Sequence, residues 1–145
     1  MKILNEFRMT VDSKSINEGF SRAVVAAFAA QLDPTLDEIS DIKMAVSEAV
    51  TNCIVHAYPD SVGKIYIYAA VLEGGTVKIS VRDKGCGIID VRQAMEPLFT
   101  TLGGERAGLG FAVMESFTDR ISVRSAPEKG TTVTMYKKIN GRAAT

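Results

Sequence analysis

Apolar side chains recur at helical spacing in two stretches near the start of the chain. In residues 16–31 the apolar positions are Ile16, Phe20, Ala23, Val24, Ala27 and Phe28. In residues 35–57, after a break at Asp33 and Pro34, they are Ile39, Ile42, Val46, Ala49, Val50 and Cys53. A period of three to four residues predicts two amphipathic helices. The face of the first helix that we expect to be solvated carries Asn17, Glu18, Ser21 and Arg22.

Runs rich in β-branched and aromatic residues predict five strands. They cover residues 2–11, 64–72, 77–82, 121–125 and 132–138, and we expect the first at an edge of the sheet. Gly74 and Gly75 predict a tight hairpin between the second and third strands. A third helix is expected to begin at Gly108 and to end near Phe117.

The order of these elements predicts the fold class. Residues 99–107, between the third strand and the third helix, have little apolar periodicity and two adjacent glycines, which is typical of a mobile lid. Three helices and five strands in this order predict an α+β fold. We expect a two-layer sandwich with helices on one face of a mostly antiparallel, mixed sheet. A length of 145 residues suits one domain, which we expect to span residues 1–145.

The composition argues against several classes of function. Lys plus Arg and Asp plus Glu both number 17, so the formal charge is zero and direct nucleic-acid binding is not expected. No run of about 18 apolar residues occurs, so we expect no membrane span, and without a signal-peptide pattern we expect a cytoplasmic location. Cys53 and Cys86 lack the CxxC spacing, which predicts two reduced thiols and no zinc site.

Three polar residues follow one another at steps of four in the second predicted helix. Glu48, Asn52 and His56 therefore share one helical face. The amide oxygen of Asn52 suits Mg²⁺, which takes further ligands from water and phosphate, and Glu48 would accept the proton of an attacking hydroxyl or orient a water. For His56, contact with phosphate and simple capping of the helix end are both open. Taken singly, each residue also fits a solvated helix face.

A short acidic and glycine-rich motif follows the third strand. Asp83 would accept a hydrogen bond from an exocyclic amine such as that of adenine, while Gly85 and Gly87 would let a flat ring lie against bare backbone. The same pattern also forms ordinary turns, in which an aspartate caps nearby amides. The pairing of this motif with the helical one favours ATP binding over a plain turn.

A second glycine pair opens the third predicted helix. Gly108 and Gly110 would present free backbone amides and the positive end of the helix to a triphosphate. No Gly-Lys-Ser/Thr sequence follows, so this is not a P-loop. Arg106 precedes the pair and would contact the terminal phosphate, although a solvated loop arginine fits as well.

Taken in order, these motifs and the later Gly130-Thr131-Thr132 resemble the N, G1, G2 and Gly-Thr boxes of the GHKL ATPase/kinase superfamily. Residues 28–60, 95–101 and 108–132 further resemble the anti-sigma-F factor family of endospore-forming bacteria. The resemblance implies a Bergerat-type (GHKL) fold that binds ATP and Mg²⁺. It also implies a homodimer that inhibits the sporulation sigma factor F and acts as a serine kinase on the anti-anti-sigma factor.

The resemblance assigns roles to particular residues. Glu48 and Arg106 would be catalytic, Asn52 would hold Mg²⁺, and Arg22 would dock a partner. The remaining nucleotide-binding residues would be His56, Asp83, Gly85, Gly87, Gly108, Gly110 and Thr131. The lid departs from the family pattern, because residues 102–105 are glycine-rich and one residue shorter, which puts the reach of Arg106 in question.

Three other functions compete with this hypothesis. A general-stress anti-sigma kinase would show similar boxes. A histidine kinase catalytic domain would share them, but we see no preceding dimerisation helix with an acceptor histidine, and His56 lies inside the nucleotide motif. A switch that holds ATP and only sequesters its partner would share them too, and it would transfer phosphate slowly or not at all.

Overall fold

The computed structural model describes residues 1–88, 90–91, 95 and 110–141. The helices are α1 (Ile16–Ala29), α2 (Leu36–Asn52) and α5 (Phe111–Ser116), with a 3₁₀ turn η1 (Ala30–Leu32) and a π-helix η2 (Cys53–Ala57). The strands are β1 (Ile3–Asp12), β2 (Lys64–Leu72), β3 (Thr76–Asp83), β4 (Arg120–Ala126) and β5 (Gly130–Lys138). The predicted lid, residues 99–107, lies outside the described residues.

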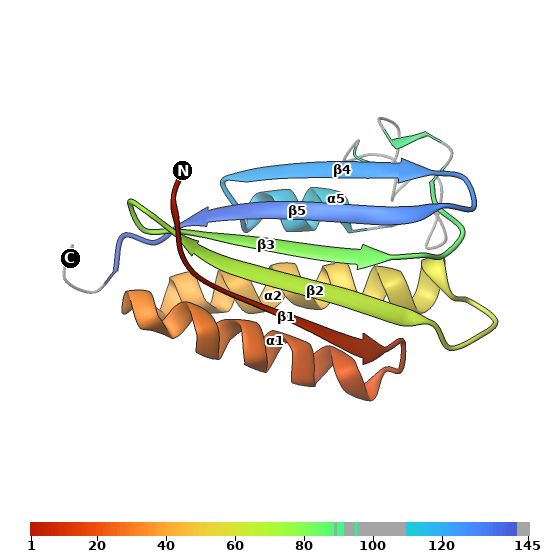
Figure 1. Ribbon diagram of the computed structural model, residues 1–145, viewed down its shortest axis with the longest axis horizontal. Coiled ribbons are helices and arrows are strands. Elements are labelled where there is room, and N and C mark those ends of the chain that lie inside the picture. The colour runs from red at the N-terminus through yellow and green to blue at the C-terminus, as the bar shows by residue number, and fades with distance from the viewer. Residues whose placement is uncertain (89, 92–94, 96–109, 142–145) are drawn as a thin grey trace.

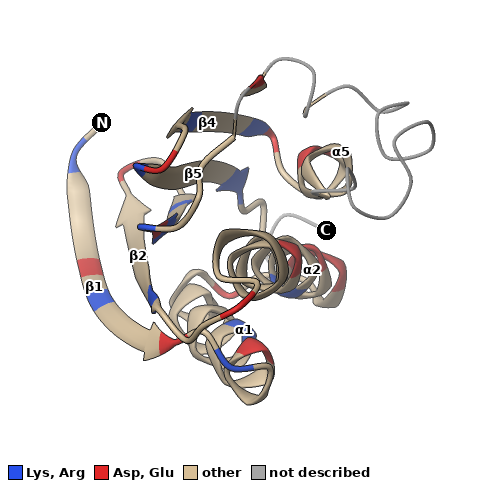
Figure 2. Cartoon of the chain, turned by 90° about the vertical axis from the view of Figure 1, so that its right-hand side faces the viewer, with Lys and Arg blue, Asp and Glu red and all other residues tan. Residues whose placement is uncertain are grey.

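The five strands form one sheet in the order β1-β2-β3-β5-β4 (Figure 1). Each neighbouring pair in this sheet is antiparallel, and β1 lies at an edge as the sequence predicts. The helices α1, α2 and α5 lie on one side of the sheet (Figure 2). The predicted α+β fold, with helices on one face of the sheet, is therefore confirmed.

The core lies between the sheet and α2. Alternate residues of the central strands point to the helices and are buried, among them Ile65, Ile67, Val77, Ile79, Val81, Val133 and Met135. They pack with the predicted apolar face of α2, where Ile42, Val46 and Val50 are at most 1% exposed. Burial of one such side chain contributes about 1.5–3 kcal/mol, so this layer fixes α2 firmly along the sheet.

The predicted orientation of α1 is wrong. Ile16 and Phe20 were expected in the core, but they are 79% and 53% exposed, whereas Ser21 is fully buried. Val25 and Ala29 continue the buried side of the helix. Because small side chains such as Ser21 and Ala29 let two helices approach closely, the face of α1 that carries them packs inward, and Ile16 and Phe20 lie outside.

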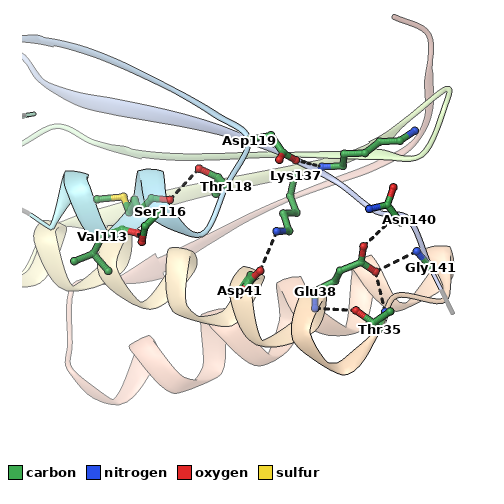
Figure 3. A network of polar contacts seen from close by, with 12 residues as sticks. Thr35, Glu38, Asp41, Val113, Ser116, Thr118, Asp119, Lys137, Asn140 and Gly141 are labelled. Atoms are coloured by element: carbon green, nitrogen blue, oxygen red, sulfur yellow. Dashed lines mark hydrogen bonds and ion pairs between the residues drawn. The ribbon is translucent and has the colours of Figure 1, made fainter. Parts of the chain in front are cut away.

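The N-terminal end of α2 is hydrogen-bonded to residues 140–141. Thr35 and Glu38 form a capping box, in which each side chain accepts a hydrogen bond from the other's backbone amide. The Glu38 carboxylate also accepts from the amides of Asn140 (2.7 Å) and Gly141 (3.1 Å) (Figure 3). Burial opposes ionisation here, but these backbone donors prevail and hold the pKa of Glu38 below its ordinary value.

Within the part of the chain that the structure describes, no helix is long and apolar enough to cross a membrane. The expected cytoplasmic location and the extent of the domain, residues 1–145, stay predictions.

Candidate functional site

The carboxylate of Asp83 lies where β3 ends beside the C-terminal end of α2. Its Oδ1 accepts hydrogen bonds from the amides of Gly85 (2.9 Å) and Thr131 (3.2 Å). Its Oδ2 lies 3.6 Å from the thiol of Cys53, which donates to it from the first turn of η2. Residues far apart in the sequence thus meet at one carboxylate that is only 6% exposed.

Burial and hydrogen bonding act against each other at this carboxylate. Burial raises the pKa of Asp83 above its ordinary value, while the three donors favour the charged form. Burial and then the charge of Asp83 raise the pKa of Cys53, so the thiol keeps its proton and acts as a donor. An ionised Asp83 is an acceptor, as recognition of an amine requires.

Gly85 and Gly87 lie close to the backbone of η2 and β4. A Cβ atom at position 85 would collide with the carbonyl of Ala57, at the end of η2. Gly87 has a φ of 75°, and a Cβ there would collide with the carbonyl of Ala126 in β4. Close packing against backbone therefore requires both glycines, and their predicted contact with a heterocycle stays a prediction.

The helix predicted to continue to residue 57 changes form after Asn52. In η2 the amide of Tyr58 donates to the carbonyl of Cys53 at 3.1 Å, which is the wider spacing of a π-helix. Single π-turns are frequent at functional sites. His56 is half-buried in this turn, and its backbone carbonyl accepts from the thiol of Cys86 (3.1 Å). Phosphate contact and capping remain the two interpretations of the His56 ring.

Glu48 lies half-buried on α2, one turn before Asn52. Burial and, after it, the negative charge of Glu18 raise the pKa of Glu48 above its ordinary value. Gly110 caps α5 with a φ of 70°, and a Cβ there would collide with Oε2 of Glu48. The start of α5 therefore lies directly against the predicted base, and Gly110 joins Glu48 at this end of the molecule.

Arg22 lies on the exposed side of α1 and contacts α2 through two polar residues. Its guanidinium donates to both carboxylate oxygens of Glu18 (2.7 and 2.9 Å) and to the hydroxyl of Ser47 (3.3 Å). The Ser47 hydroxyl in turn donates to Glu18. The predicted docking residue is thus linked to the segment that carries Glu48.

Two residues that sequence reasoning missed hold the site together. The hydroxyl of Tyr58 accepts from the amide of Lys84 (2.7 Å) and donates to the carbonyl of Lys64 (2.8 Å), so it ties the glycine turn to β2. Ser125 accepts from the amide of Ile88 (2.8 Å) and shares a hydrogen bond with the Thr131 hydroxyl (2.7 Å). A sequence pattern carries no signal for such long-range contacts with backbone.

Part of the predicted site falls outside the described residues, namely Arg106 and Gly108. Among the residues that are described, no group of three or more His, Cys, Asp and Glu side chains could hold a metal ion. An Mg²⁺ ion that takes most ligands from phosphate and water needs no such group. Asn52 is therefore compatible with the predicted role.

Residues 16–137 match the family model of the histidine kinase-like ATPase domain. The RsbU and RsbW domains of a Mycobacterium tuberculosis protein have a similar structure, with a TM-score of 0.67 and 23% identity, covering 93% of this chain and 32% of that one. The histidine kinase domain of an Erythrobacter litoralis blue-light activated histidine kinase is also similar, with a TM-score of 0.58 and 18% identity, covering 85% of this chain and 61% of that one. The fold is that of a histidine kinase-like ATPase domain, and the predicted GHKL fold is confirmed.

Relatives named anti-sigma F factor match the chain over nearly its whole length. The protein of Caldanaerobacter subterraneus subsp. tengcongensis is 57% identical over 140 residues, which are 96% of this chain and 97% of that protein. The protein of Bacillus subtilis is 48% identical over 138 residues, or 94% of each chain. The chain therefore belongs to the anti-sigma F factor family, as the resemblance predicted.

Proposed function

We propose that this anti-sigma factor binds the sporulation sigma factor F and uses ATP to phosphorylate a serine of the anti-anti-sigma factor. The observation that carries the proposal is the position of Asp83. It is a buried carboxylate at the end of β3, held by backbone amides, beside the helix that carries Glu48 and Asn52. The identity to proteins named anti-sigma F factor supports the choice of sigma factor F over a general-stress partner.

The adenine of ATP would be recognised by Asp83. Among the described residues, backbone amides donate to Oδ1 and the thiol of Cys53 donates to Oδ2, which leaves Oδ2 capacity for one further donor. The exocyclic amine of adenine is a donor of the required kind. Thr131, whose amide donates to Asp83, lies beside this position and would support the base.

The phosphates would lie toward the start of α5. Gly110 places the beginning of that helix against Glu48, one helical turn from Asn52. Asn52 would give Mg²⁺ one oxygen ligand, and the ion would neutralise charge on the phosphates. We propose the same phosphate-side roles for Gly108 and Arg106 as the family resemblance implies.

Glu48 would act as the general base. It would accept the proton of the partner's serine hydroxyl while the serine oxygen bonds to the terminal phosphorus of ATP and ADP leaves. A carboxylate is a better base when its pKa is nearer neutrality, and burial together with Glu18 shifts the pKa of Glu48 in that direction.

The exposed side of α1 would dock a partner. Arg22 is 44% exposed beside α2, while Ile16 and Phe20, which are 79% and 53% exposed, lie on a different face of the helix. Exposed arginine side chains are enriched at interaction surfaces. A partner carboxylate that pairs with Arg22 would compete with Glu18.

The homodimer that the resemblance implies is also part of this proposal. Sedimentation of the purified protein tests it.

Radiolabel transfer from ATP to the anti-anti-sigma factor tests the kinase proposal. We expect acid-stable phosphoserine with the wild type and a decrease in rate of about 10²- to 10⁴-fold with Glu48→Gln, because the base is lost. Asp37→Asn, which removes an exposed carboxylate from the first turn of the same helix, is the matched control and should leave the rate unchanged.

Other outcomes would redirect the proposal. Unchanged transfer by Glu48→Gln would remove Glu48 as the base. Tight, ATP-dependent binding of sigma factor F without transfer would favour a switch that only sequesters its partner. An acid-labile phosphoprotein would favour histidine kinase chemistry.

A further inference from the structure

The thiol of Cys53 is the contact of Asp83 for which the proposed function gives no reason. Cys53 is 3% exposed and begins η2, directly after Asn52. Its Sγ lies 3.6 Å from Oδ2 of Asp83 and 3.4 Å from the carbonyl oxygen of Ala49, one turn earlier. A small buried hydrophobe would fill this space equally well, so the donor itself needs an explanation.

The number of acceptor positions on the Asp83 carboxylate explains why a donor is present. A carboxylate offers about four lone-pair positions, two on each oxygen. Within the described part of the chain, the amides of Gly85 and Thr131 use both positions of Oδ1. Cys53 uses one position of Oδ2. Counting only donors from described residues, one acceptor position remains, which suits one N–H of an exocyclic amine.

The thiol has a single proton and two acceptors within reach. The carbonyl of Ala49 is neutral, whereas Asp83 carries a charge when it acts as an acceptor, and hydrogen bonds to charged groups are roughly twice as strong. The proton therefore favours Oδ2 even though the two distances are similar. Carbonyl and carboxylate together leave the side chain little freedom to turn away.

We propose that Cys53 is a positioning residue that orients the Asp83 carboxylate and thereby makes the site selective for a 6-aminopurine over a 6-oxopurine. The inference rests on the proposed function, since it assumes that Asp83 contacts the base. Cys53 itself need not touch the nucleotide. Its thiol holds Oδ2 of the carboxylate, while the two backbone amides hold Oδ1.

The selectivity follows from donors and acceptors. The 6-amino group of adenine donates to the remaining position of Oδ2. The 6-oxo group of hypoxanthine would place an oxygen lone pair against a charged oxygen, which is repulsive. Without Cys53 the carboxylate can turn or bind a proton at Oδ2, and both changes weaken the hydrogen bond to the amine more than they affect the oxo group.

Titration calorimetry with ATP and with inosine triphosphate, each with Mg²⁺, tests the proposal. We expect Cys53→Ala to weaken ATP binding about fivefold, the value of one hydrogen bond of about 1 kcal/mol, and to leave binding of inosine triphosphate unchanged. Cys53→Ser keeps a donor and should retain most of the preference. Val46→Ala, which loosens the same helix in the core two turns before Cys53, is the control and should not alter the ratio of the two affinities.

A spectroscopic measurement makes the test independent of nucleotide binding. The S–H stretching band of Cys53, assigned by its absence in Cys53→Ala, should shift toward the position of a free thiol in Asp83→Asn, because a neutral amide is the weaker acceptor. A band that does not respond to Asp83→Asn would overturn the proposed contact.

The outcomes separate this inference from the function on which it rests. If the wild type prefers ATP and Cys53→Ala keeps the full preference, or if both affinities fall equally, the role of Cys53 is refuted and the ATP site stands. If the wild type binds neither nucleotide, the ATP site and the inference are both refuted.

Discussion

The two ends of the sheet and of α2 are built from the same kinds of residues but differ in what those residues contact. At the end near the β2–β3 hairpin, Glu38 is buried and its oxygens accept from backbone amides (Figure 3). At the other end Glu48 is half-buried against Gly110, and Asp83 accepts from two backbone amides and from the thiol of Cys53. The pKa of Glu38 is lowered by its donors, whereas burial raises the pKa of Glu48 and of Asp83.

The glycines differ in the same way. Gly74 in the hairpin has a φ of 91° and open space around it, while Gly87 has a φ of 75° and backbone against its Cα. A turn at one end only reverses the chain, and a turn at the other end is also packed against η2 and β4. A carboxylate with a lowered pKa and an open turn thus characterise the structural end, whereas carboxylates with raised pKa values and packed turns characterise the proposed site.

Glycine substitutions at the two ends should give the largest difference in the free energy of unfolding. Gly87→Ala should destabilise the protein by about 3–5 kcal/mol, because it combines a strained φ with a collision with Ala126. Gly74→Ala should cost about 1–2 kcal/mol, because only the φ is strained. Denaturant unfolding of both variants measures the difference. Equal losses would mean that the Gly87 turn is as free to move as the hairpin.

The structural carboxylate gives a smaller effect that depends on pH. Glu38→Gln should lose about 2 kcal/mol at neutral pH, because it disturbs hydrogen bonds to a charged group. The folded-state pKa of Glu38 is below the ordinary 4.5. The stabilisation is therefore complete above that value and is lost as the pH falls through the folded-state pKa.

Unfolding free energies measured from neutral to acid pH test this expectation. The deficit of Glu38→Gln relative to the wild type should shrink on acidification, whereas Asp37→Asn, an exposed neighbour, should show little change. A deficit that is constant with pH would show that shape, and not charge, holds the end of the chain.

The smallest effect concerns the acid side of the pH–rate profile for phosphoryl transfer, which we call its acid limb. Because a raised pKa keeps Glu48 protonated to higher pH, the rate should rise with pH as Glu48 loses its proton. Glu18→Gln removes one cause of that raised pKa, so the limb should move to lower pH. Arg22→Gln leaves the charge of Glu18 uncompensated and should move it to higher pH. Shifts of the same sign in a pH–rate profile would contradict this account.

Much of the fold could be predicted because local pattern and tertiary packing agree. The alternation in β2 and β3 and the apolar face of α2 at Ile42, Val46 and Val50 match the observed elements and the core. The strand before Asp83 could be predicted from its β-branched residues. The antiparallel β2–β3 hairpin explains why β3 ends, at Asp83, on the side of the sheet where β2 begins.

The rest depended on information that a local pattern does not hold. In α1, periodicity counted Phe20 as core, but close packing against α2 selected the small Ser21 instead. The π-turn after Asn52 and the hydroxyl of Tyr58 depend on residues far away in the sequence. The tie between Glu38 and residues 140–141 joins segments about a hundred positions apart, so the sequence offers only its capping box.

Calorimetric titration of Asp83→Asn with ATP and Mg²⁺ tests the central claim, that adenine is bound where β3 meets the C-terminal end of α2. The account predicts that the wild type and Glu48→Gln bind ATP with similar affinity and that Asp83→Asn binds at least about tenfold more weakly, since an amide presents a donor to the amine. Binding of ATP by Asp83→Asn with wild-type affinity would contradict the account.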